Sequence, residues 1–160
     1  MSIRKEVRVF APATVANVAI GYDILGFAIS RPGDEIVARF NPELKGLKIT
    51  AITGTGDKVL PYDVELNTAG VAAQRLLEHL GKSNVGIEME VHKKMPFGSG
   101  LGSSAASAAG AVVAINELLG APLSRESLLY FTVLGEVVAD GSFHADNVAP
   151  CLVGGITLIR

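Results

Sequence analysis

The clearest pattern of hydrophobic and polar positions in the chain is a strict alternation that ends at His92. Two faces result, one apolar and one largely polar: Val85, Ile87, Met89 and Val91 against Gly86, Glu88, Glu90 and His92. A period of two predicts a half-buried β-strand over residues 85–92. A second alternation, of Leu47, Ile49 and Ala51, predicts a strand over residues 47–53.

The rest of the first half predicts short strands separated by turns. Apolar runs over 7–10, 27–29 and 36–40 are typical of strands. The first is expected to stop at Pro12, because proline cannot donate a hydrogen bond to a strand ladder. The Arg-Pro-Gly sequence at 31–33 predicts a turn between the other two. We therefore expect an antiparallel, hairpin-rich first half.

The second half predicts three helices with recognisable caps. They are expected over residues 67–80, 103–119 and 124–140. Asn67 or Thr68 caps the first, Gly81 ends it, and Ser124 caps the third. The second helix is rich in alanine, and its small side chains predict close packing on a sheet.

After the third helix the sequence predicts a polar loop over 141–150 and a final strand over 153–160. A strand that ends a chain leaves an open edge. We therefore expect the chain to be the first part of a longer protein.

Composition and charge narrow the class of protein. The chain has 160 residues, of which 49% are hydrophobic and 19% charged, and this excludes disorder driven by charge. A formal charge of −2, with no basic stripe, argues against a nucleic-acid partner. The only cysteine, Cys151, excludes an internal disulfide and a cysteine-based metal site, and it is expected to be a small buried apolar residue.

Nothing in the sequence predicts membrane insertion. The amino-terminal residues have no apolar run typical of a secretory signal. The longest unbroken apolar stretch, 108–115, is far shorter than the ~20 residues that a membrane span needs. The sequence is thus typical of a cytoplasmic protein.

The segment with the most chemistry is a loop rich in glycine and serine between the 85–92 strand and the alanine-rich helix. It reads Pro96, Phe97, Gly98, Ser99, Gly100, Leu101, Gly102, Ser103, Ser104, Ala105, Ala106. Alternate glycines let main-chain amides face a ligand, and a helix start adds unpaired N–H groups and a partial positive charge. This combination predicts a polyphosphate site, with a flexible turn as the alternative.

Two well-known phosphate motifs do not fit this loop. In a dinucleotide fingerprint the third glycine would stand at position 103, which is Ser103. A Walker A loop would have a lysine after the last glycine, and none follows Gly102.

The loop resembles the second signature motif of the GHMP kinases (galacto-, homoserine, mevalonate and phosphomevalonate kinases). Residues 11–17 with 21–26 resemble the first motif, and residues 141–150 with Gly154 and Gly155 resemble a third, both in the form found in homoserine kinases. The resemblance implies an α+β fold, a mixed and mostly antiparallel sheet with helices on one face, similar to a domain of a ribosomal protein. It also implies that 1–160 is the amino-terminal, ATP-binding domain, with a carboxy-terminal domain beyond Arg160.

Two departures from the mevalonate-type pattern bear on mechanism. Thr14 stands where those relatives have a lysine, and Asn147 where they have a catalytic aspartate. The resemblance therefore implies phosphoryl transfer without a dedicated strong base. A loose transition state needs alignment and charge neutralisation more than deprotonation.

The resemblance also assigns roles to individual residues. The loop from Pro96 to Ala106 would hold the phosphates of ATP, and Ser104 with Glu136 would hold Mg²⁺. Asn67 is expected against the nucleotide base, and Lys93 or Lys94 near the nucleotide. The residues expected around L-homoserine are Asn17, Asp23, His144 and Asn147. Asp146 is expected to shape its loop rather than to touch the substrate.

The implied reaction is ATP-dependent phosphorylation of the side-chain hydroxyl of L-homoserine, with a homodimer as a possible assembly. One alternative is a nucleotide-binding module without catalysis, and another is a GHMP kinase that acts on a different small alcohol. Individual residues also have simpler interpretations: Glu136 as a solvated helix residue and Asn67 as an N-cap alone.

Overall fold

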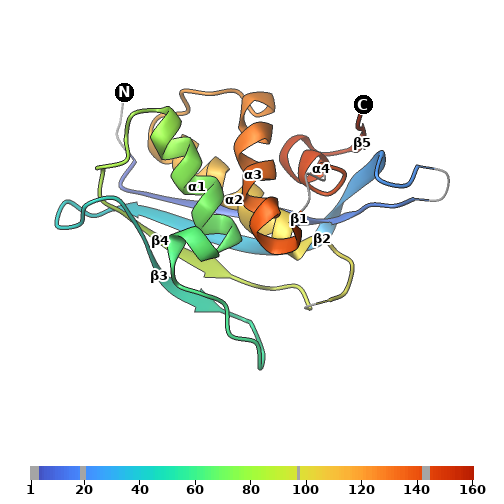
Figure 1. Ribbon diagram of the computed structural model, residues 1–160, viewed down its shortest axis with the longest axis horizontal. Helices are drawn as coiled ribbons and strands as arrows, with labels where there is room; N and C mark the ends of the chain where they lie inside the picture. Colours follow the sequence, from blue (N-terminus) through green and yellow to red (C-terminus); the bar gives the residue numbers. More distant parts are fainter. Residues whose placement is uncertain (1–3, 19–20, 97, 142–144) are drawn as a thin grey trace.

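The computed structural model describes residues 4–18, 21–96, 98–141 and 145–160. One sheet carries helices on one of its faces, as Figure 1 shows. The strands are β1 (Glu6–Val15), β2 (Leu25–Phe40), β3 (Leu47–Thr53), β4 (Ile87–His92) and β5 (Ile156–Leu158). The helices are α1 (Thr68–His79), α2 (Ser103–Leu118), α3 (Leu129–Asp140) and α4 (Val148–Val153), with 3-10 turns at Val64–Leu66 and Glu126–Leu128. The predicted α+β class is confirmed.

The sheet is mixed and mostly antiparallel, as predicted. Its order is β1-β2-β4-β3, and β5 pairs with β2 off this path. Among the strands in the described residues, β3 and β4 are the one pair that runs parallel, and β4 lies between β2 and β3. The expectation of an antiparallel first half is therefore wrong for β3, which pairs in parallel with β4 and is not a neighbour of β2.

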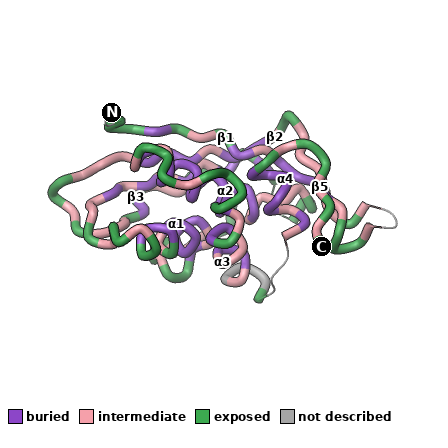
Figure 2. Tube along the Cα trace, turned by 90° about the horizontal axis from the view of Figure 1, so that it is seen from above, coloured by how far each residue is buried: buried purple, intermediate pink, exposed green. Residues whose placement is uncertain are grey.

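Helix α2 is the centre of the fold. It is buried on almost every side, between the sheet and the helices α1 and α3 (Figures 1 and 2). Its Gly110 lies so close to β2 that an added Cβ would stand 2.7 Å from Cγ1 of Ile36. The small side chains thus have the predicted effect of letting the helix pack closely on the sheet.

The predicted turn at 31–33 is wrong, because β2 runs through it without interruption. Gly33 pairs with Pro12 across the β1–β2 ladder. A Cβ on Gly33 would stand 2.4 Å from Cζ of Phe10 and 2.6 Å from the carbonyl oxygen of Ala11. Glycine is present here because strand β1 approaches closely. The local sequence does not distinguish such a close approach from a turn.

Strand β1 also continues past Pro12, where it was predicted to stop. The register of the β1–β2 pair shifts between Pro12 and Thr14, so the proline lies at an irregularity. A proline is tolerated there because the missing N–H removes no regular ladder bond.

The end of the chain differs from its prediction in two ways. Helix α4 occupies part of the segment predicted as the polar loop 141–150. Pro150 is its third residue, and proline is accepted in the first helical turn. Strand β5 is not left without a partner, because Leu25–Phe27 of β2 pairs with it.

In the part of the chain that the structure describes, no helix is both long enough and apolar enough to span a bilayer.

Cys151 is buried, as predicted, and its thiol donates to the carbonyl of Pro12 at 3.3 Å. Burial raises the pKa of the Cys151 thiol to about 12, and the charges of Asp34 and Glu136 act in the same direction. Since the thiolate is the reactive form, we expect Ellman's reagent at pH 8 to react about 10³-fold more slowly with the folded chain than with the chain in guanidinium. Equal rates would contradict the burial of this thiol.

Candidate functional site

The glycine-rich loop between β4 and α2 has the conformation that its sequence predicts. Gly98, Gly100 and Gly102 have φ values of 71°, 72° and 65°, a region that favours glycine. Gly102 is also the N-cap of α2, and no side chain caps the helix. The first amides of α2 therefore face a site that suits an anion.

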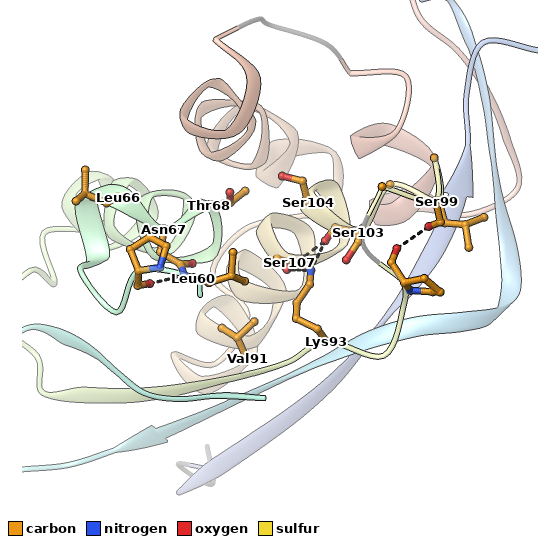
Figure 3. Close-up of a pocket in the computed structure, with 16 residues that line it drawn as sticks. Leu60, Leu66, Asn67, Thr68, Val91, Lys93, Ser99, Ser103, Ser104 and Ser107 are labelled. Atoms are coloured by element: carbon orange, nitrogen blue, oxygen red, sulfur yellow. Dashed lines mark hydrogen bonds between the residues drawn. The ribbon is translucent and has the colours of Figure 1, made fainter. Parts of the chain in front are cut away.

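A pocket of about 390 Å³ lies against this loop and the start of α2 (Figure 3). Every described residue from Pro96 to Ser104 lines it: Pro96, Gly98, Ser99, Gly100, Leu101, Gly102, Ser103 and Ser104. Ala105 and Ala106 do not line it, because they are fully buried in α2 and pack in the core. Phe97 lies outside the described residues.

The other wall of the pocket is apolar and comes from the segment before α1. Leu60, Pro61 and Leu66 line it, together with Asn67 and Thr68 at the helix start. A polar end formed by main-chain amides beside an apolar wall suits a ligand with a charged tail and a flat apolar ring.

Asn67 lines the pocket, but its side chain also caps α1. Its Oδ1 accepts from the amides of Ala69 and Gly70 at 3.0 and 3.3 Å, and its Nδ2 donates to the carbonyl of Pro61 at 2.8 Å. The predicted cap is thus confirmed. The contact between Asn67 and a nucleotide base stays a prediction.

Ser104 and Glu136 meet at the pocket, although 32 residues separate them. The Ser104 hydroxyl donates to Oε1 of Glu136 at 2.6 Å. Only 9% of Glu136 is exposed, so the interpretation as a solvated helix residue is wrong. A hydroxyl and a carboxylate are ligands that Mg²⁺ accepts in nucleotide sites, where phosphate oxygens and water complete the coordination. This pair therefore fits the predicted metal.

The two departures from the mevalonate-type pattern are hydrogen-bonded to each other. The Thr14 hydroxyl donates to Oδ1 of Asn147 at 2.8 Å, and the Thr14 amide donates to the carbonyl of Leu101 at 3.1 Å. A Cβ on Gly102 would stand 2.2 Å from Oγ1 of Thr14 and 2.9 Å from Oδ1 of Asn147. A neutral Thr–Asn pair thus lies directly under the helix start.

The first and third motifs are also in contact away from this pair. A Cβ on Gly26 would stand 1.8 Å from the carbonyl oxygen of Asp146. Asp146 is buried, and its carboxylate accepts from the amide of Asn147 at 3.1 Å. This arrangement agrees with the prediction that Asp146 shapes its loop.

Asn17 and Asp23 are brought together by the structure. Both have positive φ, 58° and 59°, and Oδ1 of Asn17 accepts from the amide of Asp23 at 3.0 Å. Both side chains are exposed, so they are accessible to a small polar molecule. Asn17 lies three residues after Thr14, whose amide contacts the glycine-rich loop at Leu101. His144, the fourth predicted substrate residue, lies outside the described residues.

A buried ion pair that was not predicted from the sequence lies under the loop. Nζ of Lys93 lies 2.5 Å from Oδ2 of Asp34, and both side chains are almost fully buried. Burial lowers the pKa of Lys93, and the charge of Asp34 opposes this shift. Lys94, the alternative lysine, instead pairs with Glu35 and is half exposed. Lys93 is therefore the lysine that lines the pocket.

The close contact at Gly102 is tested by comparing the stability cost of an alanine there with the cost of an alanine at Gly98. Gly102→Ala combines a left-handed backbone with a clash against Thr14, and we expect it to lower the free energy of unfolding by about 2–4 kcal/mol. Gly98→Ala has open space around the new Cβ, so only the backbone strain of about 1–2 kcal/mol remains. Urea denaturation measures both, and equal losses would contradict the close contact at Gly102.

Comparison with known proteins agrees with this geometry. The model of the GHMP kinases N terminal domain matches residues 67–155, more than half of the chain. The chain belongs to the GHMP kinase family and carries its amino-terminal domain.

The curated relatives that match nearly all of the chain include homoserine kinases. The chain is 49% identical over 164 residues to a homoserine kinase from Chlorobium phaeobacteroides, covering 98% of this chain and 51% of that protein. It is 46% identical over 154 residues to the homoserine kinase of Methanococcus vannielii, covering 96% and 50%. The chain thus spans about half the length of the curated relatives it matches.

Solved structures support the same family. A crystal structure of homoserine kinase from Cytophaga hutchinsonii superposes with a TM-score of 0.94 at 54% identity, covering all of this chain and 50% of that one. The mevalonate kinase of Methanococcus jannaschii shares the fold, with a TM-score of 0.73 at 17% identity, covering 94% of this chain and 52% of that one.

Proposed function

We propose that residues 1–160 are the ATP-binding domain of an enzyme that phosphorylates the side-chain hydroxyl of L-homoserine to O-phospho-L-homoserine, a step toward threonine. The observation that carries this proposal is the pocket in which three left-handed glycines and an uncapped helix start meet the Ser104–Glu136 pair. The homoserine kinases with which the chain shares about half of its residues support the choice of substrate.

In this proposal the triphosphate of ATP lies along the glycine-rich loop. The amides of the loop and of the first turn of α2 donate to phosphate oxygens, and the helix dipole offsets part of their charge. The apolar wall formed by Leu60, Pro61 and Leu66 receives the base. Fixed donors of this kind stabilise the charge that develops in the transition state.

Ser104 and Glu136 would hold Mg²⁺, which when bound offsets charge on the phosphate oxygens. In the chain described here the Ser104 hydroxyl donates to the carboxylate, so both oxygens already lie at one point of the pocket. Burial of Glu136 keeps bulk water away from that point.

The substrate hydroxyl attacks the γ-phosphorus, the bond to ADP breaks, and the hydroxyl proton leaves to a phosphate oxygen or water. The neutral Thr14–Asn147 pair supplies no strong base. The proposed contribution of the chain is therefore alignment, with Asn17 and Asp23 holding the polar groups of homoserine.

Calorimetry with Mg·ATP and L-homoserine, added separately and together, tests the proposal. We expect Mg·ATP to bind the chain alone, and L-homoserine to bind better when nucleotide is present. Binding of Mg·ATP with no effect of homoserine would favour a nucleotide-binding module. A response to another small amino alcohol instead would favour a different substrate, and no binding of Mg·ATP would overturn the proposal.

A cytoplasmic location, a homodimer and the lack of a nucleic-acid partner stay predictions. The acidic charge balance of the chain supports the last of them.

A further inference from the structure

The proposed reaction does not use the buried ion pair of Asp34 and Lys93. Asp34 is fully buried, and only 3% of the Lys93 side chain is exposed. A buried ion pair gains little stability over apolar residues of the same size. The presence of the pair is therefore better explained by a role in fixing one conformation of the surrounding chain.

Both residues extend the inward-facing stripes of neighbouring strands. Asp34 lies on the same face of β2 as the buried residues Ile36 and Ala38. Lys93 continues the face of β4 that carries the buried residues Met89 and Val91. The two strands are paired, so their inward stripes lie side by side. The ion pair thus lies at the end of the core, where α2 begins.

Asp34 holds both ends of the glycine-rich segment. Its Oδ1 accepts from the amide of Lys94 at 2.7 Å, at the start of the segment. Its Oδ2 accepts from the hydroxyl of Ser103 at 2.9 Å, at the end of the segment. One carboxylate thus joins the end of β4 to the first residue of α2.

Lys93 completes the arrangement from the opposite side. Its Nζ donates to the carbonyl of Ser103 and to the hydroxyl of Ser107, both at 2.6 Å (Figure 3). Its positive charge also offsets that of Asp34, which would otherwise repel phosphate next to the site. The pair therefore fixes the loop without adding net negative charge.

We propose that Asp34 and Lys93 are positioning residues that hold the ends of the segment 94–103 together, so that its amides are aligned before nucleotide arrives. The proposal rests on the proposed function, because the aligned amides matter only if phosphate binds there. Alignment in advance improves affinity for the group that contacts the loop, the triphosphate, and leaves contacts elsewhere unchanged.

Two double variants separate positioning from general stability. Asp34→Leu/Lys93→Met removes both charges and both hydrogen bonds of Asp34, and apolar replacement of a buried pair is usually tolerated. Asp34→Asn/Lys93→Met also removes both charges, but the amide keeps a partner for Lys94 N–H and for the Ser103 hydroxyl. The control is Arg39→Met/Glu90→Gln, which breaks an ion pair between the same two strands on the opposite face.

Dissociation constants for ATP and for adenosine are measured by NMR titration. We expect Asp34→Leu/Lys93→Met to weaken ATP about tenfold or more and to leave adenosine within about twofold. The asparagine variant should recover a large part of this loss, and the control should bind both ligands like the unchanged chain. Equal ATP affinity in all variants, or a parallel loss of ATP and adenosine, would overturn the proposal.

If Asp34→Leu/Lys93→Met does not fold, Ser103→Ala takes its place, since it removes the hydrogen bond from the helix start to Asp34 and leaves the main-chain amides of the loop in place. We expect it to weaken ATP about threefold or more with adenosine unchanged. No change in ATP affinity would again overturn the proposal.

The effect of the ion pair on the loop can also be measured by NMR without nucleotide. This test does not depend on the proposed function. The amide signals of Gly98, Gly100 and Gly102 should move toward random-coil positions in Asp34→Leu/Lys93→Met, while the rest of the spectrum is kept. Signals that stay in place would overturn the positioning role even if ATP binds. If the unchanged chain fails to bind ATP, the proposed function fails while the effect on the loop still stands.

Discussion

Glu136→Gln is expected to abolish most of the contribution of Mg²⁺ to ATP binding. The substitution keeps the shape of the side chain and its hydrogen bond with Ser104, but it removes the negative charge that the metal requires. We expect the dissociation constant for Mg·ATP to rise about 10- to 100-fold, the cost of one charged contact. Titration calorimetry in Mg²⁺ measures it directly.

The same titration in excess EDTA is the internal control, because ATP without metal should bind Glu136→Gln at least as tightly as the unchanged chain. Glu78→Gln serves as the matched variant, since Glu78 lies on α1 and pairs with Arg75 instead of facing the pocket. An unchanged Mg²⁺ dependence in Glu136→Gln would remove Glu136 from the metal site.

The chain of 160 residues is expected to bind Mg·ATP and yet to release almost no ADP in the presence of L-homoserine. It spans half the length of the homoserine kinase from Cytophaga hutchinsonii, so we expect it to lack part of the groups that align the substrate in that enzyme. Loss of alignment between two reactants removes several orders of magnitude in rate. We expect turnover about 10³-fold or more below that of the Cytophaga enzyme.

A coupled assay of ADP release, with the Cytophaga enzyme at the same concentration as the positive control, makes this comparison. Turnover by the chain at the rate of the control would contradict the expectation. It would also mean that Asn17, Asp23 and the third motif suffice to orient the substrate.

The elements that the sequence predicted well are those whose pattern has a single physical cause. The alternation in β4 reflects one buried face, and the start of α1 follows from the side chain of Asn67. The alternate glycines of the loop before α2 were predicted to let main-chain amides face a ligand, and they have positive φ values, which glycine allows. Local chemistry decides each of these features, so the local sequence was enough.

The errors lie where a contact across the sheet determines the structure. Gly33 looks like a turn residue, but it is a glycine because Phe10 and Ala11 approach it closely. The position of β3 beside β4, rather than beside β2, is likewise a matter of topology. No local signal distinguishes these cases.

The site itself was predictable in part. The Ser104–Glu136 pair was expected from the resemblance, and the structure brings the two side chains together. The Asp34–Lys93 pair was missed, although extending the alternation of β4 by one step places Lys93 on the inward face. A prediction based on apolar residues ends at Val91, so it does not include the buried charge of Lys93.

The central claim is that the glycine-rich loop and the start of α2 bind the triphosphate of ATP. A crystal of the chain soaked with Mg²⁺ and a non-hydrolysable ATP analogue tests it most directly. The account predicts phosphate density within hydrogen-bonding distance of the amides from Gly98 to Ser104, with the metal between Ser104 and Glu136. Triphosphate density elsewhere on the molecule, with this pocket empty, would contradict it.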